Sequence, residues 1–359
     1  MKLLRPLQFS ICLFFLTALS ATLCAQDVPH YTLFTYSIIN TNPAYSGAFE
    51  GTVRIGGHFR DQAFTMSPNT YVTPAFYADA PLFRGFGKQD WIGAGVTFFN
   101  DQAGTLELSH GGFLGSLSYH LAMDKDRKNV LTFAVQAGSM SRRLKTQELR
   151  LPDDVRDGTT GMGSTSQDAQ RLGTDPSTSY FDLNAGLLFR SKISKQTNMN
   201  LGLAFKHILT PNYAFLGNNQ TSQMNADSST SDIPLRVTFH GDFSFQLNKK
   251  WALSPAFIAN FAKSSETAVQ FWVDHTLDPE KKKDQLLRFG LGYRLQDAAQ
   301  VLVGYHTKRL RFALGYDLTL SDLKDAVNTF GGGIEFGASY ILTIYKDPEI
   351  VPVIICPRF

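Results

Sequence analysis

The chain has 359 residues, of which 43% are hydrophobic, 13% are aromatic and only 18% are charged. Typical soluble domains carry about 25% charged residues, so this composition, with its 29 glycines and 29 phenylalanines, favours thin β-sheet walls. The formal net charge of +3 is small and the basic residues are dispersed, which argues against a nucleic-acid partner. All-β folds of this length often form one domain, so length alone does not divide the chain.

The first residues have the pattern of a secretory signal peptide. Lys2 and Arg5 precede an apolar run at 9–19, and the small residue Ala25 lies where a signal peptidase would cut. The apolar run is shorter than a transmembrane helix requires. We therefore predict that residues 1–25 are a signal peptide and that the mature chain is exported.

The cysteines predict no disulfide in the mature chain. Cys12 and Cys24 lie in the predicted signal peptide, which leaves Cys356 alone. Lipidation of Cys24 is an alternative, but the large Leu23 before it does not fit a lipobox. No later segment has about 18 consecutive apolar residues, so a membrane protein of this sequence must cross as a β-barrel, which satisfies its backbone hydrogen bonds between strands.

Alternation of apolar and polar residues is the strongest pattern in the sequence. From 235 to 247 each odd-numbered residue is apolar or glycine and each even-numbered residue is polar, without exception. Because successive side chains of a strand point to opposite faces, this period of two predicts a strand with one apolar face. About fourteen segments show related patterns, at 53–60, 69–80, 90–100, 107–121, 129–146, 180–190, 198–209, 235–247, 251–262, 267–275, 285–296, 299–307, 310–320 and 331–345.

The polar faces of these segments suit a hydrogen-bonded lumen better than a solvated sheet, because arginines and acidic residues recur on them. Segments of roughly 9 to 13 residues also match tilted membrane-spanning strands. We predict an all-β fold, a single transmembrane outer-membrane β-barrel of about 14 antiparallel strands. A secreted β-sandwich, whose strands also alternate, is the alternative. The predicted lumen charge network consists of Arg236, Asp242, Arg288, Arg294, Arg311, Asp317 and Glu335.

The connections between the segments alternate in length. Short ones lie at 122–128, 191–197 and 248–250, whereas 147–179 and 210–234 are long and polar. Outer-membrane barrels have short periplasmic turns and longer outer loops. The two long stretches are therefore predicted to be cell-surface loops.

No pattern in the sequence indicates an enzyme. The run that begins at Asp153 resembles a calcium loop, but Val155 and Ser164 occupy positions where an acid and a glutamate are needed. No HExxH, CxxC or GxSxG motif occurs. We predict no catalytic residues, no metal ligands and no cofactor.

Three motifs lie in order along the mature chain. The first reads Asn-Pro-Ala-Tyr-Ser-Gly at 42–47, the second spans 293–317, and the third is Cys-Pro-Arg-Phe at 356–359. In these motifs the sequence resembles the PorP/SprF family of type IX secretion system outer-membrane proteins. The positions that carry the resemblance are Asn42, Pro43, Ala44, Gly47, Tyr293, Arg294, Asp297, Ala298, Gly315, Tyr316, Asp317, Cys356, Pro357, Arg358 and Phe359.

The chain departs from that family at two places. It has Gly315 where members often have a serine, and it reads Gly-Gly-Gly-Ile-Glu at 331–335 where members often read Gly-Ser-His-Glu-Ile. These departures concern the subgroup within the family, and with it the particular partner, and not the barrel.

The resemblance implies a barrel of the type IX secretion and gliding apparatus in the outer membrane. Such a barrel would bind a secreted adhesin or its C-terminal domain and retain it at the cell surface, or it would act as a component of the secretion complex. Its partners would be these proteins and outer-membrane lipid. A porin-like or lipophile transport channel is the alternative, and a soluble secreted β-sandwich adhesin is the second alternative.

The expected organisation has four parts. A signal peptide at 1–25 precedes an N-terminal periplasmic segment at 26–52, the barrel covers 53–345, and an extended tail covers 346–359. Pro43 has a fixed φ and Gly47 permits a positive φ, so we expect a rigid turn just before the first strand.

Overall fold

The structure is a computed structural model that describes residues 31–62, 64–65, 71–86, 89–104, 107–145, 175–214, 232–277, 285–321 and 332–344. The predicted signal peptide, most of the two long loops and the C-terminal tail with residues 356–359 lie outside the described residues. No helix within the described ranges is long and apolar enough to cross a membrane.

The described chain contains two short helical turns followed by fourteen strands. Helix α2 spans Ile38–Thr41 and the 3₁₀ turn η1 spans Pro43–Tyr45. The strands are β1 (Val53–Asp61), β2 (Tyr71–Phe86), β3 (Asp90–Ala103), β4 (Leu108–Ala122), β5 (Asn129–Arg143), β6 (Ser177–Lys192), β7 (Thr197–Lys206), β8 (Arg236–Gln246), β9 (Trp251–Phe261), β10 (Ser265–Thr276), β11 (Leu286–Arg294), β12 (Ala298–His306), β13 (Leu310–Thr319) and β14 (Gly332–Leu342).

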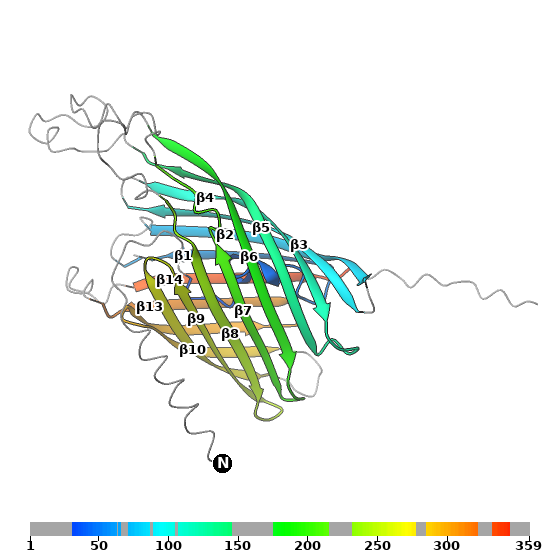
Figure 1. The fold of residues 1–359 in the computed structure, drawn as a ribbon. Helices are drawn as coiled ribbons and strands as arrows, with labels where there is room; N and C mark the ends of the chain where they lie inside the picture. The colour runs from blue at the N-terminus through cyan, green and yellow to red at the C-terminus, as the bar shows by residue number, and fades with distance from the viewer. Residues whose placement is uncertain are drawn as a thin grey trace, which may run out of the picture.

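The strands form one closed antiparallel barrel (Figure 1). Each strand pairs with its neighbours in sequence, and β1 closes the sheet by pairing with β14 over nine residue pairs from Val53↔Leu342 to Asp61↔Ile334. All fourteen strands that the alternation predicts are present. The β-sandwich alternative is wrong, because a closed sheet leaves no second layer to pack against it.

The barrel has two distinct ends, which we name by the connections that leave them. The terminal rim is the end where β1 begins and β14 ends, and the loop rim is the opposite end. Because all neighbours are antiparallel, both long connections, after β5 and after β7, leave from the loop rim, as does the turn between β11 and β12. Strands β4 to β6 extend beyond the others toward the loop rim (Figure 1).

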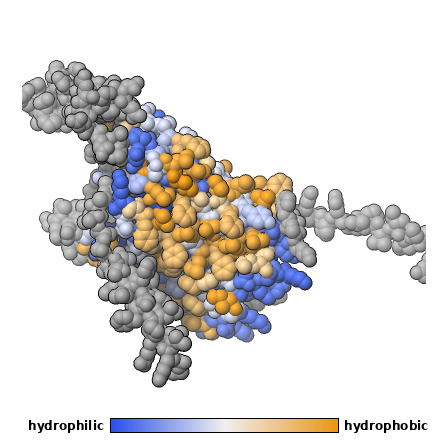
Figure 2. Space-filling view, viewed as in Figure 1, coloured by the Kyte–Doolittle hydropathy of each residue, from blue (hydrophilic) through white to orange (hydrophobic). Residues whose placement is uncertain are grey.

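The outer wall is apolar and the inner wall is polar, as the alternation predicts. In β4 Leu117 is 59% exposed while Ser118 is 2% exposed, and in β8 Phe239 is 41% exposed while His240 is 3% exposed. Hydrophobic residues spread over the outer face of the strands, with hydrophilic residues gathered toward the two ends (Figure 2). This arrangement suits a wall that faces lipid, because apolar side chains need no hydrogen-bond partners there.

The N-terminal residues 31–50, which we call the lumen segment, lie inside the barrel (Figure 1). Leu33 and Tyr36 pack with Trp272, Leu302 and Ala313 of the wall. On other parts of the segment Phe34, Ile38, Ile39 and Ala44 contact further wall residues in three separate clusters. The segment therefore provides apolar surface to an interior that is otherwise polar, and it fills space that the wall side chains leave open.

A charge on the outer face tests the orientation of the wall. Leu291 lies in the middle of β11 and is 67% exposed. We expect Leu291→Arg to lower the free energy of unfolding by about 2–4 kcal/mol in lipid vesicles, the cost of a cation at the bilayer midplane. Denaturant titration of the refolded protein measures this, and Leu291→Ala controls for lost side-chain volume. Equal stability of the two variants would contradict a lipid-facing position.

Candidate functional site

The lumen segment crosses the barrel from the loop rim toward the terminal rim. At one end Thr32 contacts Arg60 and Glu335, which lie in the loop-rim halves of β1 and β14. At the other end the carbonyl of Ala48 accepts a hydrogen bond of 2.7 Å from Arg190, near the terminal-rim end of β6. The Asn-Pro-Ala-Tyr-Ser-Gly motif thus lies within the lumen.

Glu335 holds the start of the lumen segment. Its carboxylate accepts hydrogen bonds from the backbone N–H groups of Thr32 at 2.8 Å and Leu33 at 2.5 Å. The same carboxylate lies 2.7 Å from His58 Nε2 and 2.6 Å from Arg60 Nη1. Glu335 is 1% exposed, so these four partners replace the water that the charge lacks.

Asp317 and Arg294 extend this cluster. Asp317 accepts a hydrogen bond of 2.7 Å from the Thr32 hydroxyl and lies 3.1 Å from both Arg60 Nη2 and Arg294 Nη2. Arg294 also donates to Asp297 at 2.8 Å, at the turn between β11 and β12. Acids and guanidinium groups therefore alternate around Thr32, and each buried charge has a partner of opposite sign.

The predicted residues Arg294, Asp317 and Glu335 are brought together in this loop-rim cluster. The sequence analysis missed Arg60 and also Glu266, whose carboxylate lies 2.9 Å from Arg294 Nε. A signal for Arg60 existed, because it shares the polar face of the first alternating segment. Nothing in the period of two, however, reveals which of the polar faces meet across the lumen.

Asn42 anchors the middle of the lumen segment. Its side chain accepts a hydrogen bond of 2.9 Å from the N–H of Ala44, which caps the 3₁₀ turn beginning at Pro43. Its Nδ2 donates to the Leu187 carbonyl at 2.9 Å and lies 3.1 Å from His240 Nε2. The motif therefore forms a capped turn whose first residue is tied to β6 and β8.

Gly47 ends the motif at a close approach of the lumen segment to the wall. Its φ is +69°, and a Cβ built on it would lie 2.6 Å from the Cα of Gly93. Its N–H donates to Asp79 at 2.7 Å, and its carbonyl accepts from Trp91 Nε1 at 2.9 Å. Asp79 in turn is paired with Arg54 at 2.7 Å. Only glycine combines this backbone conformation with this approach.

The other family-motif positions lie at different places. Tyr293 is 43% exposed on the outer wall, whereas Ala298 is 2% exposed. A Cβ on Gly315 would lie 3.1 Å from Leu302 of the wall, a tight contact, and 3.5 Å from Leu33 of the lumen segment, an ordinary one. Tyr316 is half-buried in β13.

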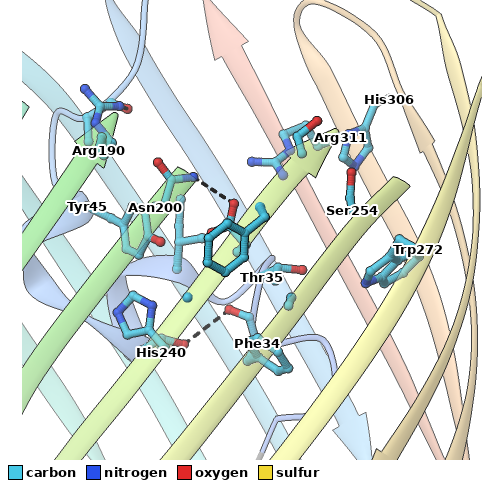
Figure 3. A pocket seen from close by; sticks show the side chains of 18 of the residues that line it. Phe34, Thr35, Tyr45, Arg190, Asn200, His240, Ser254, Trp272, His306 and Arg311 are labelled. Atoms are coloured by element: carbon cyan, nitrogen blue, oxygen red, sulfur yellow. Dashed lines mark hydrogen bonds between the residues drawn. The ribbon is translucent and has the colours of Figure 1, made fainter. Parts of the chain in front are cut away.

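The remaining predicted lumen charges do not join the loop-rim cluster. Arg236 is buried near the start of β8. Asp242, Arg288 and Arg311 instead line a cavity of about 330 Å³ beside the lumen segment (Figure 3). The seven predicted charges thus lie in at least two groups rather than around one centre.

The described residues offer little for metal chemistry. They contain no group of three or more His, Cys, Asp or Glu side chains placed to hold a metal ion. The loop-rim cluster is composed of ion pairs between the wall strands and of hydrogen bonds to Thr32 and Leu33, so its arrangement can hold the lumen segment against the wall.

Comparisons with known proteins give one family and several distant barrels. The sequence profile of a family described as "Type IX secretion system membrane protein PorP/SprF" matches residues 23–340. No curated protein matches the sequence.

Three similar solved structures are two toluene transporters and a FadL homologue. The toluene transporter TodX of P. putida is 13% identical with a TM-score of 0.49, over 86% of this chain and 94% of that chain. The Ralstonia pickettii toluene transporter TbuX is 12% identical with a TM-score of 0.46, over 85% of this chain and 92% of that chain. A Pseudomonas aeruginosa FadL homologue is 11% identical with a TM-score of 0.42, over 83% of this chain and 92% of that chain. At these values the similarity carries no argument about function.

Gly47 offers a test of how the lumen segment docks. We expect Gly47→Ala to lower the free energy of unfolding by about 1–3 kcal/mol or more, because the substitution adds a steric clash to a strained φ. Gly104→Ala is the matched control, since Gly104 has a φ of +75° and a Cβ there would have no atom within 4 Å. Denaturant titration compares the free energies of unfolding of the two variants. An equal loss in both would show that the close approach of Gly47 to Gly93 contributes nothing to stability.

Glu335 offers a test of the loop-rim cluster. We expect Glu335→Ala to lower the free energy of unfolding by about 3–5 kcal/mol. The substitution leaves the buried Arg60 with one acidic partner fewer and removes the acceptor for two backbone N–H groups. Limited proteolysis should then cut within residues 31–50 faster than in the parent. Glu50→Ala, at an exposed position, is the control. Unchanged protection of the lumen segment in Glu335→Ala would contradict the anchoring role.

Proposed function

Because the chain belongs to the PorP/SprF family of type IX secretion system membrane proteins, we propose that it is an outer-membrane barrel that binds a secreted adhesin, or that protein's C-terminal domain, and retains it at the cell surface. In this proposal the loop rim faces the cell exterior. A role as a component of the secretion complex itself belongs to the same class, since both are binding roles.

The observation that carries this proposal is the anchored lumen segment. It is tied to β14, β13 and β1 through Thr32, to β6 and β8 through Asn42, and to β2 and β3 through Gly47. A segment held on several sides of the wall obstructs the lumen and stiffens the barrel. Such a barrel suits a rigid platform for protein binding better than an open passage.

The long connections after β5 and β7 are the proposed contact with the partner. Both leave from the loop rim, next to the ends of β4 to β6 that extend beyond the other strands (Figure 1). Long loops on a rigid scaffold are where binding residues usually lie. The gliding connection that the sequence resemblance implies would follow if the retained protein is an adhesin that contacts the substratum.

Co-purification from native membranes tests the proposal. We expect the affinity-tagged protein in mild detergent to recover a secreted protein with a type IX C-terminal domain or another secretion-system protein. Replacing residues 150–170 with a short Gly/Ser linker should reduce that recovery at least tenfold while the barrel still shows heat-modifiable gel migration. The control replaces Met123–Arg127 of the β4–β5 turn, at the terminal rim, with a linker of equal length.

Two outcomes would contradict the binding role. One is recovery of the intact protein without any secreted or secretion-system protein. The other is a steady open-channel current from the purified protein in planar bilayers, which would favour the porin-like or lipophile transport alternative.

A further inference from the structure

The cavity beside the lumen segment occupies the terminal-rim half of the barrel. The wall residues of the cavity come from the terminal-rim halves of β1 and of the strands β6 to β13. The lumen segment, including Thr35 and Tyr45, lines the cavity from inside the barrel (Figure 3). Four arginines and two aspartates line it: Arg54, Arg190, Arg288, Arg311, Asp242 and Asp274. Because arginines outnumber aspartates, the lining has an excess of positive charge.

Two of the four arginines are already neutralised. Arg288 Nε donates to Asp274 at 2.6 Å, and Asp274 also accepts from Ser254. Arg54 is paired with Asp79 through two hydrogen bonds of 2.9 and 2.7 Å. These pairs contribute little net attraction for a ligand, because each guanidinium group already faces a carboxylate.

The other two arginines have no such partner. Within the part of the chain that the structure describes, no carboxylate lies within ion-pair distance of Arg190 or Arg311. Arg190 donates to one backbone carbonyl, that of Ala48, while its Nε is buried without a hydrogen-bond partner. Arg311 lies over the ring of Tyr36, with its guanidinium carbon 5.5 Å from the ring centre.

One neutral polar group at the same cavity also has no hydrogen-bond partner. Thr35 lines the cavity, and its hydroxyl is buried without a hydrogen-bond partner. The carboxylate of Asp242 accepts from Asn200 at 2.7 Å. Buried polar groups without partners in a charged cavity indicate a missing acceptor.

We propose that this cavity is a binding site for a small oxyanion, a carboxylate or phosphate group, with Arg311 and Arg190 as its charge partners and the Thr35 hydroxyl as a further donor. A planar guanidinium group can donate two parallel hydrogen bonds to two oxygens of either a carboxylate or a phosphate. A volume of about 330 Å³ lies at the lower end of the range for small-molecule pockets, which limits the ligand to a small organic acid or phosphate ester. The site is independent of the protein partner at the loop rim.

Titration of the purified full-length protein in nonionic detergent tests the site. The probes are inorganic phosphate and succinate, in a buffer low in chloride, and calorimetry or the fluorescence of Trp272, which lines the cavity, gives the dissociation constant. We expect saturable binding of at least one probe. Phosphate alone assigns a phosphate ester, succinate alone assigns an organic acid, and both together assign the oxyanion in general.

Three variants separate the site from non-specific attraction. Arg311→Gln should weaken binding at least tenfold, as expected for loss of a charge-assisted hydrogen bond. Thr35→Val removes a hydroxyl that has no partner in the structure and should weaken binding severalfold. This variant provides the test of the site if Arg311→Gln fails to fold. Lys308→Gln removes an equal charge from an exposed position at the same rim and should leave binding unchanged.

Three results would overturn the proposal. They are the absence of saturable binding of either probe, binding that Arg311→Gln and Thr35→Val both leave intact, and an equal loss in Lys308→Gln. The last result would mean that the anions respond to the overall positive charge of the rim and not to the cavity.

Discussion

Pairing of the polar groups inside the barrel is the constraint on which the rest of this structure depends. A closed sheet with an apolar outer face must turn its polar side chains inward, where bulk water is restricted. Fourteen strands also enclose more space than their own side chains fill, since about eight suffice for a packed interior. The lumen segment meets both requirements, because it brings apolar side chains to the empty space and backbone N–H groups to the buried acids.

The seam of the barrel and the anchor of the lumen segment are the same place. Arg60 and Glu335 are direct cross-strand partners where β1 pairs with β14, and their ion pair is 2.6 Å long. The same Glu335 carboxylate accepts the N–H groups of Thr32 and Leu33. Closure of the sheet therefore completes the site that holds the segment, and the two events should be energetically coupled.

The two halves of the lumen differ in how far this pairing is carried. Near the loop rim every charge of the cluster around Thr32 faces an opposite charge, which gives a rigid base beneath the long connections. Near the terminal rim Arg190 and Arg311 lack carboxylate partners among the described residues, and both line the cavity beside the lumen segment. A rigid half suits the binding of a large protein, and an unsatisfied half suits a small ligand.

The sequence by itself determined the wall of this protein. The period of two located all fourteen strands and assigned the apolar face to the outside. This was possible because the alternation of apolar and polar side chains is visible within a few neighbouring residues. The sequence also identified Gly47 as a position for positive φ and assigned seven charges, Arg294, Asp317 and Glu335 among them, to the inner face. These are local properties, so they can be read without knowledge of the fold.

Only the tertiary structure decided what lies inside the wall. Thr32 and Glu335 are 303 residues apart in the sequence, and no local pattern relates them. The lumen position of the Asn-Pro-Ala-Tyr-Ser-Gly motif, the roles of Arg60 and Asp79, and the separation of the predicted charges into a cluster and a cavity all follow from barrel closure. A strand's periodicity states which face a side chain occupies, but the partner across the lumen is set by the register and curvature of the whole sheet.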